Sequence, residues 1–192
     1  MDVVETGTLT EAMHAATDQL AAWANQIRYY HCSGVPMSGL VLLAQNEIRQ
    51  GHADVVIVDY LQKAPLHEYV RGLTPAQMRG ADVEALKHLA EIENVRVLLL
   101  AQVNREARTA KRKTRDLIRD TGEADEKANL VIMLDREILD EPMDSYEAGD
   151  YSPVLKVRVD KQTIGRTGET TLWIDLPNFR IHNMEQHKVK PK

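Results

Sequence analysis

The chain has 192 residues, of which 43% are hydrophobic and 28% charged, and its formal net charge is −5 at pH 7. This length is enough for one domain with a hydrophobic core, and no apolar run approaches the roughly 20 residues of a membrane-spanning helix. The negative charge argues against broad coating by nucleic acid, while a single cysteine, Cys32, and the lack of a signal-peptide pattern indicate a cytoplasmic protein without a disulfide framework or a membrane partner.

Residues 1–52 are predicted to be a helical lead-in that contains one short strand. Thr10–Tyr30 is rich in alanine and has a threonine at the N-cap position, so it predicts a helix. A short strand is predicted over Ile27–Cys32, ended by Ser33, Gly34 and Pro36. Ser38–Gln50 predicts a second helix that ends at Gly51.

Residues 53–137 carry the predicted core of the sheet. Ala53–Tyr60 contains four branched apolar residues in a row, which indicates a strand buried on both faces of a parallel sheet. A helix over Gln77–Glu93 and a second buried strand over Val95–Val103 complete a strand–helix–strand unit. Leu130–Leu134 predicts a third buried strand.

The C-terminal part is predicted to be antiparallel. Residues 138–153 are acidic and contain proline and glycine, which is typical of a flexible surface loop. Strands are predicted at Val154–Lys161, Thr170–Asp175 and Phe179–His182, within residues 154–183, and a basic tail follows over 184–192. The fold class is therefore α/β, with a mostly parallel sheet flanked by helices and antiparallel strands at its C-terminal end.

Two polar residues end the most apolar strands. Asp59 follows the first strand, where α/β sheets bind ligands and where phosphate-handling enzymes place the Walker B carboxylate that holds the water shell of Mg²⁺. The alternative for Asp59 is a residue that caps the following turn. Gln102 ends the second strand, where a neutral amide can sense a γ-phosphate; the alternative is a solvent-exposed strand end.

A basic segment comes directly after Gln102. Arg105–Arg119 has seven Lys or Arg residues and two acidic ones. Such a run is commonly a solvated face, but its attachment to a candidate phosphate sensor favours the arrangement of a nucleic-acid motor.

Four blocks of the sequence together resemble DnaB-type replicative DNA helicases, in the C-terminal RecA-like motor domain of that family. The blocks are VVIVDYLQ (Val55–Gln62), LLLAQVNRE (Leu98–Glu106), DLIRDTGEADEKANLVIMLDRE (Asp116–Glu137) and VRVDKQTIGRTG (Val157–Gly168). The resemblance implies that Asp59 is the Walker B carboxylate, which holds Mg²⁺ through water, and that Gln102 is the γ-phosphate sensor. It also implies that Arg119, Asp120 and Gly122 grip the backbone of single-stranded DNA.

The resemblance further implies residues that act on the ATP of a neighbouring subunit. Lys161 matches a basic residue that reaches across the subunit interface. The family places its arginine finger two residues later, where this chain has Thr163. Arg166 is the candidate replacement for that finger.

The 192 residues contain no G-x-x-x-x-G-K-[ST] motif. In the family, the strand of this phosphate loop lies between the strand that ends at Gln102 and the strand Leu130–Leu134, and the catalytic glutamate follows it. Both would precede Met1, so we expect a partial RecA-like sheet with two edges that lack their shared partner. ATP and Mg²⁺ would serve the intact motor, and we expect this chain alone to bind neither stably and to hydrolyse no ATP.

Two functions follow from these features. The first is a portion of an ATP-dependent hexameric helicase that binds single-stranded DNA and unwinds duplex DNA in a bacterial or phage-infected cell, with other helicase subunits as partners in a homo-hexamer. The alternative is a non-enzymatic DNA-binding or ring-interaction module, derived from a helicase or another RecA-fold protein.

Overall fold

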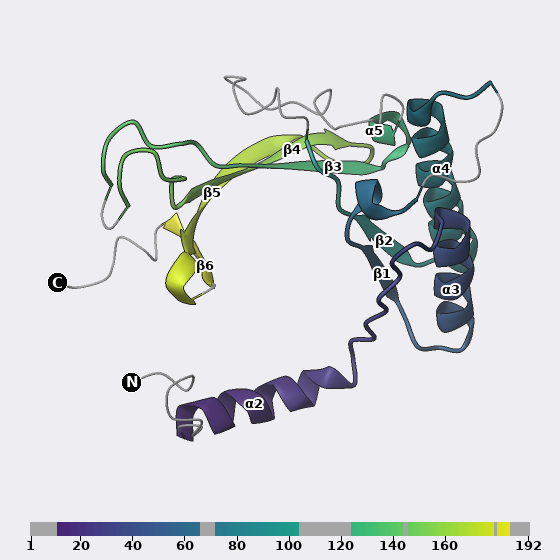
Figure 1. Cartoon of the computed structure of the whole chain (residues 1–192), viewed down its shortest axis with the longest axis horizontal. Helices are drawn as coiled ribbons and strands as arrows, with labels where there is room; N and C mark the ends of the chain where they lie inside the picture. The colour runs from purple at the N-terminus through teal and green to yellow at the C-terminus, as the bar shows by residue number, and fades with distance from the viewer. Residues whose placement is uncertain (1–10, 66–71, 104–123, 144–145, 179, 185–192) are drawn as a thin grey trace. The chain divides into compact units, whose positions relative to one another are not determined.

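The structure is a computed structural model that describes residues 11–65, 72–103, 124–143, 146–178 and 180–184 (Figure 1). The chain forms two compact units, Met1–Ser33 and Gly34–Lys192. Its elements are a mixture of helices and strands, which confirms the predicted α/β class. Within the described residues, none of the helices has the length and apolar character to cross a membrane.

The first unit contains helix α2, which spans Glu11–Ala24 and is shorter than predicted. The strand predicted at Ile27–Cys32 is wrong, because these residues form no helix or strand. A strand requires a neighbour that accepts and donates backbone hydrogen bonds, and no described residue pairs with this segment. The aromatic side chains of Trp23 and Tyr29 are 64% and 84% exposed, so they are not buried within this unit.

Helix α3 spans Met37–Arg49 in the second unit, close to its predicted bounds. The glycine at its end was predicted to be a cap, and Gly51 does adopt a positive φ of 75°. The N–H of Gly51 donates to the carbonyl of Ile48 (2.9 Å), and that of His52 to the carbonyl of Glu47 (2.9 Å). This pair of hydrogen bonds is the Schellman motif, which satisfies the last carbonyls of the helix.

Helix α4 spans Pro75–Glu93. Thr74 and Gln77 form a reciprocal capping box at its start, and Asn94 ends it in the left-handed conformation with φ 54°. The predicted end at Glu93 is confirmed, whereas the helix begins two residues before the predicted start at Gln77, because the Thr74 cap places Pro75 in its first turn.

Strands β1 (Val55–Val58) and β2 (Arg96–Leu99) form a two-stranded parallel sheet, with Val58 opposite Leu99. A 3-10 helix at Leu61–Lys63 and α4 connect them, which confirms the predicted strand–helix–strand unit. One face of the sheet packs with α3 and α4 (Figure 1). The shared core contains Met37, Leu61, Ala64, Val83 and Leu86, with Leu40, Val41, Val58, Val97 and Leu99 packed against it.

The prediction that β1 is buried on both faces is wrong. Val56 and Val58 are half-buried, whereas Val55 and Ile57 on the opposite face are 48% and 63% exposed. Leu98 of β2 is 53% exposed on that same face. The reason is that α3 and α4 cover only one side of the pair, and no described element packs against the other.

The remaining strands form a separate antiparallel sheet in the order β3–β4–β5–β6. Their bounds are β3 Leu130–Asp135, β4 Val154–Gln162, β5 Gly168–Asp175 and β6 Arg180–Asn183. A short helix, α5 (Ala124–Lys127), precedes β3, and a 3-10 helix at Leu176–Asn178 precedes β6. Residues 138–153, predicted to be a surface loop, contain two isolated β-bridges, Ile138–Tyr151 and Met143–Tyr146.

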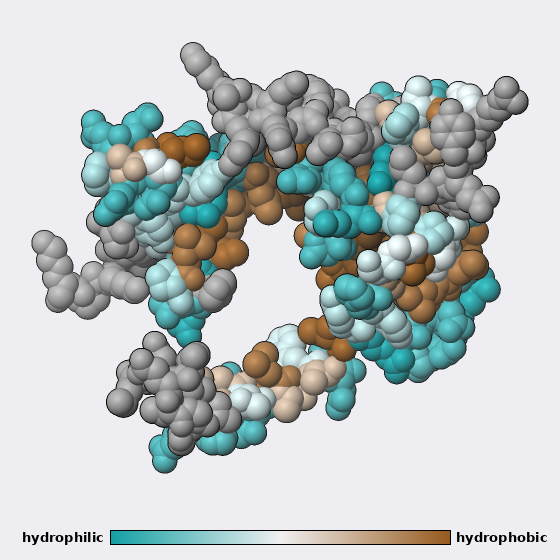
Figure 2. Space-filling model, in the orientation of Figure 1, coloured by the Kyte–Doolittle hydropathy of each residue, from teal (hydrophilic) through white to brown (hydrophobic). Residues whose placement is uncertain are grey.

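The two sheets are not joined through a shared strand. Among the described residues, β2 pairs only with β1 and β3 only with β4. On β3, Leu130, Ile132 and Leu134 are 46%, 48% and 60% exposed, and Figure 2 shows apolar surface, in brown, along this sheet. An ion pair between Lys127 of α5 and Glu84 of α4, with 2.7 Å between Nζ and Oε2, links the two parts of the unit.

Candidate nucleotide and DNA site

Asp59 and Gln102 lie at the same end of the β1–β2 sheet, beyond the carboxyl ends of its two strands. Asp59 follows β1 directly, and Gln102 comes shortly after β2. The strands are parallel and their pairing continues beyond Leu99, since the N–H of Leu100 donates to the carbonyl of Val58 (3.0 Å). Both side chains are exposed at the carboxyl ends of neighbouring strands, where ligands bind in α/β sheets.

Gln62 connects the two strand ends and was not singled out from the sequence. Its Nε2 donates to the carbonyl of Gln102 (3.1 Å), and its Oε1 accepts from the N–H of Gln102 (3.0 Å). The two residues are 40 positions apart. A polar residue shortly after a strand has many possible hydrogen-bond partners. No local sequence signal therefore identifies Gln102 as the partner of Gln62.

A buried ion pair supports the segment after β1 from the other side. Arg79 and Asp82 of α4 are only 7% and 3% exposed, and Arg79 Nη1 lies 3.2 Å from Asp82 Oδ2. Arg79 Nη2 also donates to the carbonyl of Ala64 (2.7 Å). A charge this deeply buried needs such partners, and here they attach the 3-10 helix region to α4.

Lys161 and Thr163 lie at the end of β4 and make contacts within the chain. Lys161 Nζ donates to the carbonyl of Glu126 at α5. The N–H and the hydroxyl of Thr163 both donate to the carbonyl of Asn129, each at 3.0 Å. Arg166 is exposed in the turn between β4 and β5. These three residues belong to the antiparallel sheet, and no described contact joins them to Asp59 or Gln102.

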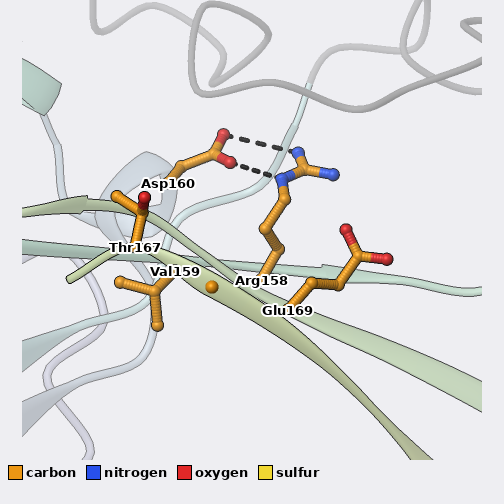
Figure 3. Close-up of a pocket in the computed structure, with 6 residues that line it drawn as sticks. Arg158, Val159, Asp160, Thr167 and Glu169 are labelled. Carbon is orange, nitrogen blue, oxygen red and sulfur yellow. Dashed lines mark hydrogen bonds and ion pairs between the residues drawn. The ribbon is translucent and has the colours of Figure 1, made fainter.

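A shallow pocket beside this turn is poorly suited to an anion (Figure 3). Arg158 and Asp160 lie on the same side of β4 and form an ion pair, with side chains 11% and 13% exposed. The hydrogen bond from Arg158 to Asp160 raises the pKa of the guanidinium. Glu169 faces Arg158 across the β4–β5 pairing. One cation with two carboxylates leaves no excess positive charge for a phosphate.

The predicted DNA-contacting residues lie outside the described residues. This applies to Arg119, Asp120 and Gly122, and to the whole basic segment Arg105–Arg119. Their assignment therefore stays a prediction from the sequence.

Comparison with known protein families shows to which family the chain belongs. The family of the DnaB-like helicase C-terminal domain matches residues 1–183. The chain belongs to this family. Sequence comparison with curated proteins finds no significant match.

Two solved structures share the fold of this DnaB-like chain. One is the structure of an ATPase domain, which superposes with a TM-score of 0.76 at 18% identity, covering 94% of this chain and 63% of that one. The other is the structure of a DnaB-like replicative helicase and its interactions with primase. It superposes with a TM-score of 0.75 at 16% identity, covering 92% of this chain and 42% of that one. The DnaB-like chain thus spans less than two thirds of each of these relatives.

Asp59 fits the role of a water-mediated Mg²⁺ contact but not that of a complete metal site. Its carboxylate is exposed at the strand end and has no hydrogen-bond or ion-pair partner among the described residues. No group of three or more His, Cys, Asp or Glu residues capable of holding a metal occurs in the part of the chain that the structure describes. Mg²⁺ keeps several waters and binds through few carboxylates together with substrate phosphates, which is compatible with a single carboxylate.

Proposed function

We propose that these 192 residues provide the Walker B, sensor and DNA-loop part of the motor of an ATP-dependent hexameric replicative DNA helicase. One observation carries the proposal: Asp59 and Gln102 end neighbouring parallel strands, and Gln102 leads within three residues into the basic segment Arg105–Arg119. Membership of the DnaB-like family supports it.

The proposed roles follow from the chemistry of the residues. In the intact motor, the Asp59 carboxylate would help to hold Mg²⁺ through water, and the Gln102 amide would sense the γ-phosphate of ATP; the ion would supply charge neutralisation at the phosphates. Gln102 would connect the nucleotide to the basic segment, because only two residues separate it from Arg105. Arg119 neutralises a DNA phosphate, and Gly122 allows a backbone N–H to approach another. Such contacts are independent of base sequence, as a translocating motor requires.

This polypeptide alone is proposed not to hydrolyse ATP. Its 192 residues include no phosphate-loop motif to hold the β- and γ-phosphates. At the arginine-finger position, Thr163 is neutral and its hydroxyl donates to Asn129. Arg166, exposed in the next turn, remains the proposed cation that acts with Lys161 on the ATP of a neighbouring subunit.

A second candidate function is a non-enzymatic module that joins or regulates a helicase ring. The engaged Thr163 and the exposed apolar face of β1 and β2 favour it for the chain as it stands. In this case the chain would bind DNA or helicase subunits without ATP chemistry of its own.

Fluorescence anisotropy with labelled single-stranded DNA, with and without ATP and Mg²⁺, tests the proposal. We expect binding that weakens with salt and does not respond to nucleotide, together with no phosphate release. A nucleotide-dependent affinity would contradict the assignment of an incomplete ATP site. No binding at low salt would contradict an independent DNA loop and leave ring interaction as the function.

A further inference from the structure

A pair of side-chain hydrogen bonds extends the β1–β2 pairing beyond its last backbone contact. The backbone pairing reaches Leu100, whose carbonyl accepts from the N–H of Leu61 (2.8 Å). The chain then turns into the 3-10 helix, where the N–H of Lys63 bonds to Tyr60 instead of to β2 (2.9 Å). The side chain of Gln62 takes over, and both its amide atoms bond to the backbone of Gln102 at 3.1 and 3.0 Å. We call these two bonds the amide clasp.

The clasp requires both halves of a primary amide. The Nε2 donor serves a carbonyl and the Oε1 acceptor serves an N–H, so a single side chain satisfies both polar backbone groups of Gln102. Methionine has a similar length and an apolar end, so it would keep the packing and lose both bonds. This makes Gln62→Met a selective test of the hydrogen bonds.

The segment that carries Gln62 is held firmly on both sides. Leu61 is 1% exposed and belongs to the core cluster. The carbonyl of Ala64 accepts from the buried Arg79 (2.7 Å). Since these anchors hold residues 61–64 against α4, the half-buried Gln62 side chain extends from a rigid base. Gln102, in contrast, is exposed and lies beyond the end of β2.

We propose that Gln62 is a positioning residue that fixes the backbone of Gln102, the residue that precedes the basic segment Arg105–Arg119 by three positions. The inference rests on the proposed function for the roles of Gln102 and of that segment. Asp59 lies three residues before Gln62 on the same connection, so the clasp joins the Walker B strand end to the sensor strand end. A displacement at one strand end is thereby transmitted to the other.

Amide hydrogen exchange of the full 192-residue chain tests whether the clasp holds Gln102. We expect Gln62→Met to accelerate exchange of the Gln102 N–H by about tenfold, with little change at Leu100 or in the urea midpoint. Gln50→Met is the matched control, since Gln50 bonds only to Asn46 of its own helix end (3.0 Å) in the described contacts. An unchanged rate at Gln102, or equal acceleration at every β2 amide, would overturn the proposal.

Binding of labelled single-stranded DNA by the same three proteins tests the link to the basic segment. We expect Gln62→Met to weaken binding about threefold at fixed salt, with an unchanged salt slope because the same phosphates are neutralised. Equal affinity of wild type and Gln62→Met would overturn this link. If the wild type binds no DNA, the proposed function fails for this chain, while the exchange rates still decide whether Gln62 holds Gln102.

Discussion

Arg49 of α3 and Glu93 of α4 form an ion pair, with 2.7 Å between Nη2 and Oε1, that joins the C-terminal ends of the two helices. Gln45 also donates to the same carboxylate oxygen (2.7 Å). A carboxylate at a helix C-terminus is unfavourable beside the helix dipole, so these donors offset a local cost. The contact matters for the site because α3 and α4 together cover the sheet that carries Asp59.

The Glu93 contact makes stability depend on pH. The hydrogen bond from Arg49, followed by that from Gln45, lowers the pKa of Glu93 below its ordinary value. A lowered pKa in the folded state stabilises the fold above the unfolded-state pKa of about 4.3, and this contribution is lost as the pH falls through the folded-state value. We therefore expect Glu93→Gln to flatten the loss of stability on acidification from pH 6 to pH 3, measured by urea unfolding.

Glu91→Gln is the matched control for that measurement. Glu91 is exposed and lies two residues earlier on the same helix, with 3.9 Å between its Oε1 and Lys87 Nζ. An equal flattening in Glu91→Gln and Glu93→Gln would show that the α3–α4 contact is not the cause.

Removal of Arg79 should destabilise the domain strongly. Its ion-pair partner Asp82 is 3% exposed, and the carbonyl of Ala64 also depends on it. We expect Arg79→Met to lower the free energy of unfolding by about 3 kcal/mol, since it takes the cation away from a buried carboxylate. Arg96→Met, at an exposed position at the start of β2, should change it by less than about 0.5 kcal/mol. Similar values for the two variants would contradict a structural role for the Arg79–Asp82 pair.

The exposed apolar face of the β1–β2 sheet should promote self-association. Ile57 is 63% exposed on that face, and β2 has an unpaired edge among the described residues. Unpaired strands of this kind associate with other chains. We expect the average mass in sedimentation experiments to rise with wild-type concentration and to rise less for Ile57→Lys.

Ile164→Lys provides the control for self-association. Ile164 is 96% exposed in the turn after β4, so the same substitution adds the same charge away from β1 and β2. A monodisperse wild-type monomer would contradict an interface at the β1–β2 face. Equal effects of Ile57→Lys and Ile164→Lys on the average mass would also contradict it.

The parts of the fold that were predicted from the sequence are those with local causes. The predicted end of α4 at Glu93 is followed by Asn94 in the left-handed conformation, and the predicted end of α3 is followed by Gly51 at positive φ. The start of α4 was predicted two residues late, because the Thr74–Gln77 capping box was not used. The positions of Asp59 and Gln102 follow from apolar runs that end in a polar residue. In contrast, two predictions were wrong because they depend on neighbours that the local sequence does not specify. These are the burial of β1 on both faces and the strand over residues 27–32.

The amide clasp shows the same limit at the candidate site. Gln62 belongs to a block that resembles the helicase family, yet its role depends on a partner 40 positions away. The engagement of Thr163 with Asn129, 34 positions away, likewise required the three-dimensional arrangement of β3 and β4. Local patterns indicate which residues are candidates, and only the tertiary structure shows which of them meet.

The most direct test of the central claim is the salt dependence of single-stranded DNA binding by the wild type, Arg119→Ala and Arg96→Ala. Each neutralised phosphate of single-stranded DNA contributes about 0.7 to the slope of log K against log salt. We predict that Arg119→Ala weakens binding and reduces this slope by about 0.7, whereas Arg96→Ala, at the opposite end of β2 from Gln102, changes neither. Binding that is independent of salt, or equal slopes for wild type and Arg119→Ala, would contradict the assignment of a DNA-gripping segment after Gln102.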